Sequence, residues 1–335
     1  MPQQFRLLSF VLGASIMAQL HAQSSRQWMD TSAHSLRFVG VEKSVQLEVL
    51  DWAGPGRPMI LLAGGGLTAH VFDDLAPKLA TIWHVYGITR RGFGASGYSA
   101  SDNPVDRLGD DIVAVIGALK INKPVLVGHS IAGAELSWVA NRHPDMISGL
   151  VYLDAAYSYA FDNGKGADAR EMQSLSRPQP PPPEPRDLAS FSALGKYDEG
   201  VNGVRLPEAE LHQEWESDAN GRVIKQRDPT GGATVGAVFT APRKYANIPV
   251  PALVIFANPH SQGTWIERNA DASVRASANA YSVALAALTA KQEKAVKDAV
   301  PTAHVIELPN ANHFVFLSNE ADVLREIRAF VAGLQ

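Results

Sequence analysis

The sequence comprises 335 residues, of which 46% are hydrophobic, so it can bury one large core or a core with an inserted second unit. The formal net charge is −4, which excludes the strongly basic surface typical of nucleic-acid-binding proteins. The chain contains no cysteine, and disulfide bonds, thiolate chemistry and a cysteine-linked lipid anchor are therefore excluded.

The first 22 residues have the pattern of a secretory signal peptide. Arg6 precedes an apolar run over residues 7–20, and the small residue Ala22 stands before a polar stretch. Because this run is too short to span a membrane, we expect a mature chain without a membrane span, located in a periplasm or secreted. Leu20 fits the usual cleavage pattern poorly, which leaves the cleavage site open. The alternative is a buried N-terminal helix.

Strand and helix patterns alternate along most of the chain, after a β-hairpin predicted over residues 36–51. The predicted strands lie at residues 59–62, 85–88, 125–127, 150–153, 253–256 and 304–308, and the predicted helices at 72–80, 108–120, 131–142, 278–299 and 320–333. The strands are short apolar runs suited to burial on both faces of a sheet. This order predicts an α/β fold with a mostly parallel sheet flanked by helices.

The alternation stops between residues 157 and 248, where prolines cluster at 180–183. A segment of this length cannot be a single loop in a compact domain, so we expect a mainly helical cap over the carboxyl edge of the sheet. A second irregular stretch is expected at 258–277. The predicted organisation is a signal peptide at 1–22, a first core part at 23–156, the cap at 157–248 and a second core part at 249–335.

The pentapeptide Gly128-His129-Ser130-Ile131-Ala132 follows one predicted strand and begins the next predicted helix. This context is typical of the G-x-S-x-G turn that exposes a nucleophilic serine above a sheet. Gly128 and Ala132 leave the space that the strained turn requires. We therefore predict Ser130 as a nucleophile. The alternative is an ordinary Gly-Ser turn.

A serine nucleophile needs a general base, and His313 has the appropriate position for it. It follows the last predicted strand, in a loop before the final helix, and hydrolases with this turn place the histidine late and on a loop. A structural loop histidine is the alternative. His304 lies inside a predicted strand, and His129 is expected to be structural. His260 is expected to be a solvated loop residue, with contact to the site as the alternative.

Four motifs together resemble the α/β-hydrolase superfamily: the glycine triplet in 63–66, the Arg-Gly-Phe-Gly-Ala-Ser turn at 91–96, the serine turn at 128–132, and Ala-Asn-His-Phe at 311–314. The resemblance covers nearly all of the predicted mature chain outside the cap and is closest to cap-bearing bacterial esterases. It implies an α/β-hydrolase fold and a Ser, acid, His triad. Serine at position 130 argues against the dehalogenase and epoxide-hydrolase branches, which need an aspartate there.

The acid of the triad departs from the usual pattern of the superfamily. Most members carry it after the strand that matches 253–256, but residues 257–262 contain no carboxylate here. A minority place it at the end of the preceding strand, which corresponds to Asp154. The resemblance thus favours Asp154, while Glu267 and Asp271 stay open because a loop excursion could return either of them to the histidine.

Acyl transfer also needs hydrogen-bond donors for the developing oxyanion. The backbone amide of Ile131, directly after the nucleophile, is the first predicted donor. The resemblance places the second on Gly65, with Gly66 as the alternative, although the triplet could serve as a tight turn alone. The nucleotide-binding pattern GxGxxG is absent, and the resemblance implies no metal and no organic cofactor.

The reaction implied by this resemblance is hydrolysis of a small-molecule carboxylic ester, lactone or thioester through an acyl-enzyme on Ser130. A carbon–carbon bond hydrolase, a perhydrolase and a non-catalytic ligand-binding module are the alternatives. Substrate identity and oligomeric state stay open. Aromatic residues that could line an apolar pocket are Tyr157, Tyr159, Phe161, Phe191, Trp215 and Phe239.

Overall fold

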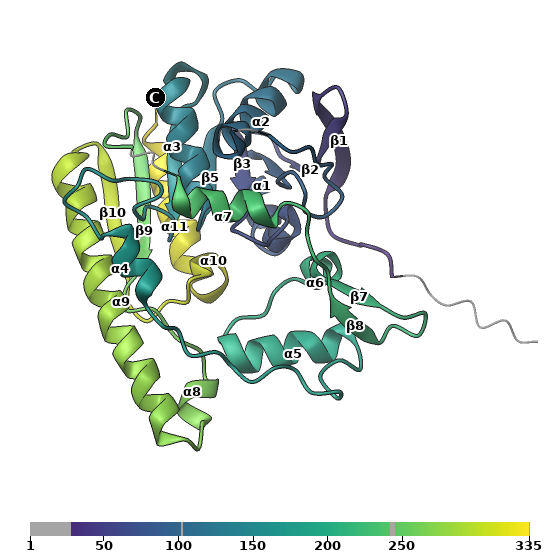
Figure 1. Ribbon diagram of the computed structural model, residues 1–335. Helices are drawn as coiled ribbons and strands as arrows, with labels where there is room; N and C mark the ends of the chain where they lie inside the picture. The colour runs from purple at the N-terminus through teal and green to yellow at the C-terminus, as the bar shows by residue number, and fades with distance from the viewer. Residues whose placement is uncertain (1–27, 102, 242–244, 335) are drawn as a thin grey trace, which may run out of the picture.

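One eight-stranded sheet organises the protein, as the computed structural model shows for residues 28–101, 103–241 and 245–334 (Figure 1). The predicted signal peptide lies outside these residues. The strand order is β1-β2-β4-β3-β5-β6-β9-β10. Strands β4 to β10 of this order are parallel, and the β1–β2 hairpin joins them antiparallel through β2. The strands are β1 Ser35–Glu42, β2 Val45–Ala53, β3 Pro58–Leu62, β4 His84–Ile88, β5 Val125–His129, β6 Gly149–Leu153, β9 Ala252–Ala257 and β10 Ala303–Leu308.

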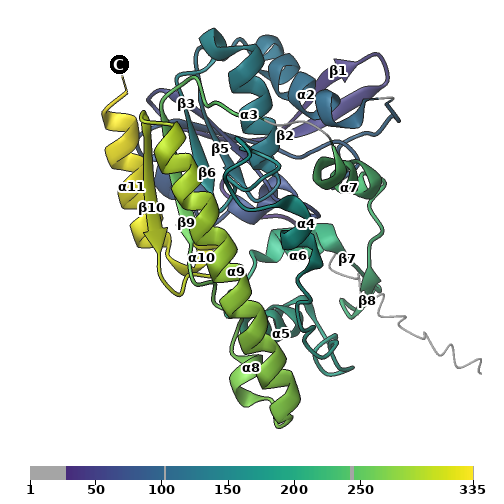
Figure 2. The same cartoon turned by 60° about the vertical axis from the view of Figure 1, so that its left-hand side comes forward.

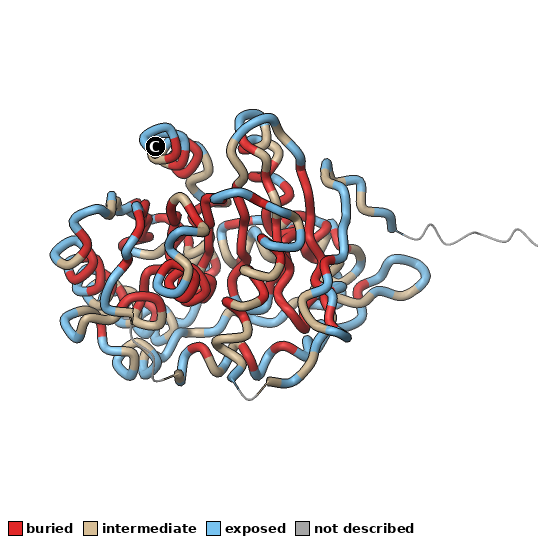
Figure 3. The backbone as a smooth tube through the Cα atoms, turned by 90° about the horizontal axis from the view of Figure 1, so that it is seen from above, coloured by how far each residue is buried: buried red, intermediate tan, exposed pale blue. Residues whose placement is uncertain are grey.

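Helices cover both faces of the sheet. One face carries α2 Pro104–Ala118, α3 Ala132–Arg142 and α9 Ala272–Ala299, and the other carries the short helix η1 Ala69–Phe72, α1 Ala76–Ala80, α10 Val315–Ser318 and α11 Glu320–Ala332. In β6, for example, Leu150 and Tyr152 pack on the first face, whereas Val151 and Leu153 pack on the second. Buried residues accordingly run through the middle of the molecule (Figure 3). No helix among the described residues is long and apolar enough to cross a bilayer.

The predicted α/β architecture is confirmed, with local differences in the helices; α2, for example, begins at Pro104 rather than at residue 108. The helix expected from residue 278 begins at Ala272, because the Asp271 carboxylate accepts a hydrogen bond of 2.7 Å from the amide of Ser273 and caps the helix earlier. The single helix expected over 72–80 is divided into η1 and α1. A short helix η2, Pro144–Met146, follows α3.

Residues 157–248 are here called the cap segment, and the part of it that the structure describes contains six short elements. These are α4 Ala169–Ser174, α5 Phe191–Asn202, α6 Glu208–Glu214, β7 Trp215–Ser217, β8 Val223–Gln226 and α7 Gly232–Thr240. In Figures 1 and 2, α5, α6 and the β7–β8 ribbon form a group set apart from the sheet, and α8, Trp265–Arg268, lies beside α5. This group has a small hydrophobic cluster of its own, formed by Phe191, Leu194, Leu211 and Val223.

A buried carboxyl group connects the cap segment to the core. Glu210 of α6 is fully buried, and its two oxygens accept hydrogen bonds from the Thr68 amide at 2.9 Å and the Thr68 hydroxyl at 2.5 Å. Burial raises the pKa of Glu210 to about 7, and the bonds from Thr68 and the nearby His70 oppose part of that shift. The contact between α6 and η1 is therefore sensitive to pH near neutrality.

This contact gives the first prediction. Since the pKa of Glu210 is raised from 4.5 to about 7 on folding, its contribution to stability is complete below pH 4.5 and is lost as the pH rises through 7. The substitution Glu210→Gln should remove this component, which is on the order of 3 kcal/mol. Urea unfolding between pH 5 and pH 8 measures it, with the exposed Glu208→Gln of the same helix as the control. Parallel stability profiles for wild type and Glu210→Gln would contradict the prediction.

Candidate active site

Ser130 stands at the sharp turn between β5 and α3. Its φ angle is +54°, in the left-handed region that few non-glycine residues adopt. The turn needs small neighbours: a Cβ added to Gly128 would lie 3.1 Å from the Cβ of Ala132. The amide of Gly133 donates a hydrogen bond of 2.9 Å to the carbonyl of Ser130, which starts the helix directly after the serine. The backbone at Ser130 therefore forms the strained strand-to-helix turn that was predicted from the sequence.

The start of α3 packs against the chain that follows β6. A Cβ on Gly133 would lie 1.9 Å from the carbonyl oxygen of Ala155, so only glycine allows this approach. The amide of Ser130 also donates to the carbonyl of Leu153 at 3.3 Å. Because β5 and β6 are adjacent and parallel, Ser130 and Asp154 leave the same edge of the sheet one strand apart.

Asp154 lies against the ring of His313. The distance from His313 Nδ1 to Asp154 Oδ2 is 2.6 Å, and the aspartate side chain is fully buried. Asp154 also has a positive φ angle, +48°. The alternatives Glu267, in α8, and Asp271, which caps α9, are exposed. The structure thus brings Ser130, Asp154 and His313 to one site, and it uses Asp154 as the partner of the histidine.

Two further side chains bind the same carboxylate. His260 Nε2 lies 2.7 Å from Asp154 Oδ2, and the Tyr157 hydroxyl donates a hydrogen bond of 2.8 Å to Oδ1. The expectation that His260 is a solvated loop residue is wrong, since its side chain is only 7% exposed. Although burial alone raises the pKa of Asp154, His260 and His313 outweigh it and lower that pKa below its usual range. The carboxylate is therefore charged and held from several sides.

His129 is structural, as the sequence suggested. It is buried, and its Nε2 donates a hydrogen bond of 3.1 Å to the backbone carbonyl of His313. Burial and the neighbouring His313 lower the pKa of His129 well below its usual value, so the ring is neutral. Its ring also packs on Phe314 and Phe316. His129 thus fixes the backbone of the loop that carries His313. His304, in β10, is exposed and lies far along its strand from this loop.

The glycine triplet after β3 runs beside the serine turn. A Cβ on Gly64 would lie 3.2 Å from the Cβ of Ser130, and one on Gly65 would lie 3.4 Å from the Ile131 side chain. Gly66 has a φ angle of +85°, which glycine adopts without strain. The two predicted oxyanion donors, the amides of Gly65 and Ile131, therefore belong to neighbouring segments.

A buried ion pair that sequence reasoning missed holds this glycine loop. The Arg90 guanidinium donates to both oxygens of Glu135, at 2.6 and 3.0 Å, and both residues are buried. Its remaining donors bind the carbonyls of Ala63 and Gly64, at 2.8 and 3.0 Å. The available signal was Glu135, the one acidic residue in the apolar helix after Ser130. Arg90 thereby connects the start of α3 to the predicted oxyanion loop.

Ser130 and His313 line a common cavity of about 340 Å³. The cap segment supplies Tyr157, Tyr159, Met172, Arg177, Asn202 and Phe239 to the wall, and α9 supplies Tyr281 and Leu285. A larger cavity of about 740 Å³ shares several of these cap residues. Of the other aromatic candidates, Phe161 packs in the sheet core, and Phe191 and Trp215 pack within the cap segment.

The comparisons with known proteins agree with this architecture. Residues 59–326 match the model of the alpha/beta hydrolase family, so the chain belongs to that family. The AB hydrolase superfamily protein YisY of Bacillus subtilis is 31% identical over 154 residues, which are 42% of this chain and 56% of YisY. The pimeloyl-[acyl-carrier protein] methyl ester esterase of Neisseria meningitidis is 33% identical over 96 residues, 28% of this chain and 34% of that enzyme.

The chain thus matches only about a third to just over half the length of these curated relatives. The crystal structure of E-2-(acetamidomethylene)succinate hydrolase superposes with a TM-score of 0.61 at 18% identity, covering 90% of this chain and 100% of that one. This likeness confirms the fold. The family and its relatives support the expectation that the chain is a hydrolase enzyme.

The partner of His313 can be tested by substitution. Asp154→Asn keeps the shape of the side chain but lets His313 adopt the wrong tautomer, so kcat should fall on the order of 10⁴-fold. Steady-state kinetics with an aryl ester measure this loss. Glu267→Gln and Asp271→Asn are the matched controls and should retain nearly full kcat. A larger loss in either control would reassign the acid.

His260 should support the site without being essential for turnover. It binds the same Asp154 oxygen as His313, but His260→Leu leaves the Asp154–His313 contact and the Tyr157 hydrogen bond in place. The kcat of His260→Leu should therefore fall far less than that of Asp154→Asn, as steady-state kinetics with the same aryl ester would measure. A loss as large as that of Asp154→Asn would show instead that His260 acts in the chemistry.

Proposed function

We propose that the protein hydrolyses carboxylic esters of small molecules through an acyl-enzyme on Ser130. One observation carries the proposal. Ser130 stands at a strained strand-to-helix turn and shares a cavity with His313. The Nδ1 atom of His313 is hydrogen-bonded to the buried carboxylate of Asp154. A hydroxyl, an imidazole and an orienting carboxylate in this order are the parts that nucleophilic acyl transfer needs.

In the first half of the proposed reaction, His313 takes the proton of the Ser130 hydroxyl as the oxygen attacks the ester carbonyl. Asp154 holds Nδ1 of the ring, so that Nε2 is left for the serine and the charged imidazolium is stabilised. The amides of Gly65 and Ile131 donate to the developing oxyanion. Removing one such donor costs about 10²–10³-fold in rate.

In the second half, His313 gives its proton to the leaving alcohol and then activates a water molecule that attacks the acyl-enzyme. Attack by this water breaks the bond between the acyl group and Ser130. The carboxylic acid product is released, and the Ser130 oxygen takes back its proton from His313. Tyr159 lines the same cavity as Ser130, and burial raises the pKa of its phenol, so it stays a neutral hydroxyl group near the nucleophile.

The cavity supports a small substrate with an apolar acyl or aryl part. Its volume of about 340 Å³ is at the lower end of the usual range for ligand sites. Aromatic and aliphatic side chains of the cap segment and α9 form much of its wall. Arg177, also in the wall, adds a positive charge at its exposed side. Short acyl esters should therefore react faster than long-chain esters.

The function is tested with a panel of p-nitrophenyl esters and a fluorophosphonate probe. Wild type should turn over short esters and be labelled at Ser130. In Ser130→Ala, labelling should vanish and kcat should fall on the order of 10⁵–10⁶-fold, with an unchanged melting temperature. Ser158→Ala, a nearby serine of the cap segment, is the matched control and should leave labelling intact.

The alternatives have their own outcomes in the same experiment. A wild-type protein that is neither labelled nor active would indicate a non-catalytic ligand-binding module. Labelling without turnover of any ester would sink the ester proposal while keeping a nucleophilic serine, as expected for a carbon–carbon bond hydrolase or a perhydrolase.

A further inference from the structure

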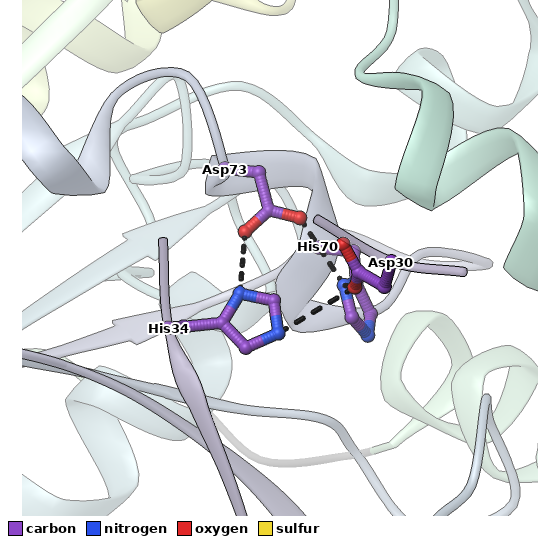
Figure 4. A group of neighbouring side chains, drawn as sticks. All are labelled: Asp30, His34, His70 and Asp73. Atoms are coloured by element: carbon purple, nitrogen blue, oxygen red, sulfur yellow. Dashed lines mark hydrogen bonds and ion pairs between the residues drawn. The ribbon is translucent and has the colours of Figure 1, made fainter. Parts of the chain in front are cut away.

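A second group of ionisable side chains lies apart from the active site. Asp30 and His34 come from the segment before β1, and His70 and Asp73 come from η1 and its C-terminal cap (Figure 4). Figure 4 shows the two imidazole rings and the two carboxylates facing one another. The proposed ester hydrolysis uses none of them.

Each carboxylate touches both imidazoles, so the four side chains form a closed ring. Asp73 lies 3.0 Å from His34 Nδ1 and 3.1 Å from His70 Nδ1. Asp30 Oδ2 lies 3.3 Å from His70 Nδ1 and 3.5 Å from His34 Nε2. Ligand atoms about 2.0–2.1 Å from a tetrahedral Zn²⁺ are separated by about 3.3 Å from one another. Three of these separations join one set of donor atoms, namely His70 Nδ1, Asp73 Oδ2, Asp30 Oδ2 and His34 Nε2, and at 3.1, 3.3 and 3.5 Å they lie close to that value. The His34 Nδ1 contact uses the other ring nitrogen and the other Asp73 oxygen, so it would be replaced when the ion binds.

We propose that Asp30, His34, His70 and Asp73 bind one divalent transition-metal ion, of which Zn²⁺ is the best match. Two imidazole nitrogens and two carboxylate oxygens are donors that Zn²⁺ accepts, and four protein ligands are typical of a structural rather than a catalytic zinc site. The two carboxylates supply the −2 charge that neutralises a divalent cation when both imidazoles are neutral.

An outer carboxylate supports a ligand role for His70. Its Nδ1 faces the ring of ligands, while its Nε2 lies 3.8 Å from Glu48 Oε1. Glu48 is itself buried and accepts a hydrogen bond of 2.6 Å from the Thr89 hydroxyl. Metal-binding histidines usually direct their second nitrogen to such a carboxylate, which fixes the tautomer and the ring orientation. This feature is independent of the four donors themselves.

The site has a closed side and an open side. The His34, His70 and Asp73 side chains are at most 7% exposed, whereas Asp30 is 24% exposed. A cavity of about 490 Å³ adjoins it, with Asp30, Asp73 and Asp74 among its lining residues. The acidic wall would attract a cation, and the cavity gives it a route to the ligands.

The bound ion would have a structural role. It would join the segment before β1 to η1, whose N-terminal cap, Thr68, binds Glu210 of the cap segment. The active-site triad needs no metal, so this proposal does not rest on the proposed ester hydrolysis, and either can fail without the other.

The test is zinc binding by tag-free protein that has been stripped with a chelator and dialysed. We expect one tightly bound Zn²⁺ per chain by calorimetric titration and elemental analysis, and tetrahedral Co²⁺ absorption after replacement. At free Zn²⁺ a hundredfold above Kd, the melting temperature should rise by about 4 °C. Asp30→Asn and His34→Gln should each raise the Kd for Zn²⁺ by more than the roughly 10–100-fold that is typical of changes outside the ligand set. Asp30→Asn is the milder change for the fold, because Asp30 is partly exposed.

Two controls locate the ion. His84→Gln removes a histidine that contacts a different carboxylate, Asp51, at 2.9 Å, and it should bind zinc like wild type. His260→Leu should do the same, since Asp154, His260 and His313 also lie close enough to share a cation. Loss of zinc in His260→Leu, or its retention in both ligand variants, would overturn the proposal. Wild type without stoichiometric zinc, and with no response of its melting temperature, would leave the cluster as an ion-pair network only.

Discussion

The carboxylate of Asp154 is fully buried at the end of β6, and hydrogen-bond donors converge on it from several parts of the chain. A buried charge without partners would cost several kcal/mol, so each of these donors must be in place in the folded protein. Tyr157 begins the cap segment, His260 follows β9, and His313 follows β10. The amide of Ala257 adds a bond of 3.1 Å from the end of β9. Hydrogen bonding to the Asp154 carboxylate therefore fixes three loops at the carboxyl edge of the sheet.

Backbone strain accompanies this charge. Ser130 and Asp154 end adjacent strands, and both have φ angles near +50°. Such conformations cost about 1–3 kcal/mol each and persist only where the surroundings hold them. Here Gly133 packs against the backbone of Ala155, and the amide of Asp154 donates to Ile255 at 2.8 Å. Backbone contacts among the ends of β5, β6 and β9 therefore hold both strained turns in place.

The sequence predicted the strands well because their apolar runs are buried on both faces, which leaves a strong signal in the residue pattern. The resemblance to the α/β-hydrolase superfamily favoured Asp154 over Glu267 and Asp271, since no carboxylate follows β9 closely. The catalytic roles of Asp154 and His313 stay predictions. His260 was misjudged because a polar loop such as residues 257–262 looks solvated unless the buried charge that it meets is known. The early start of α9 was missed because capping by Asp271 depends on a single side chain rather than on periodicity.

The stretch from Ala63 to Asp73 contacts the serine turn, the cap segment and the proposed metal site. At its start, Arg90 binds the carbonyls of Ala63 and Gly64, in the loop that runs beside Ser130. At its end, η1 contacts Glu210 of the cap segment and the Asp30 and His34 side chains. Gly66, with its left-handed φ angle, lies between the two anchored ends. Arg90 holds the carbonyls at the start of this stretch, and the chain must then turn from the glycine loop into η1. The left-handed φ angle at Gly66 allows that turn without the strain that another residue would add there.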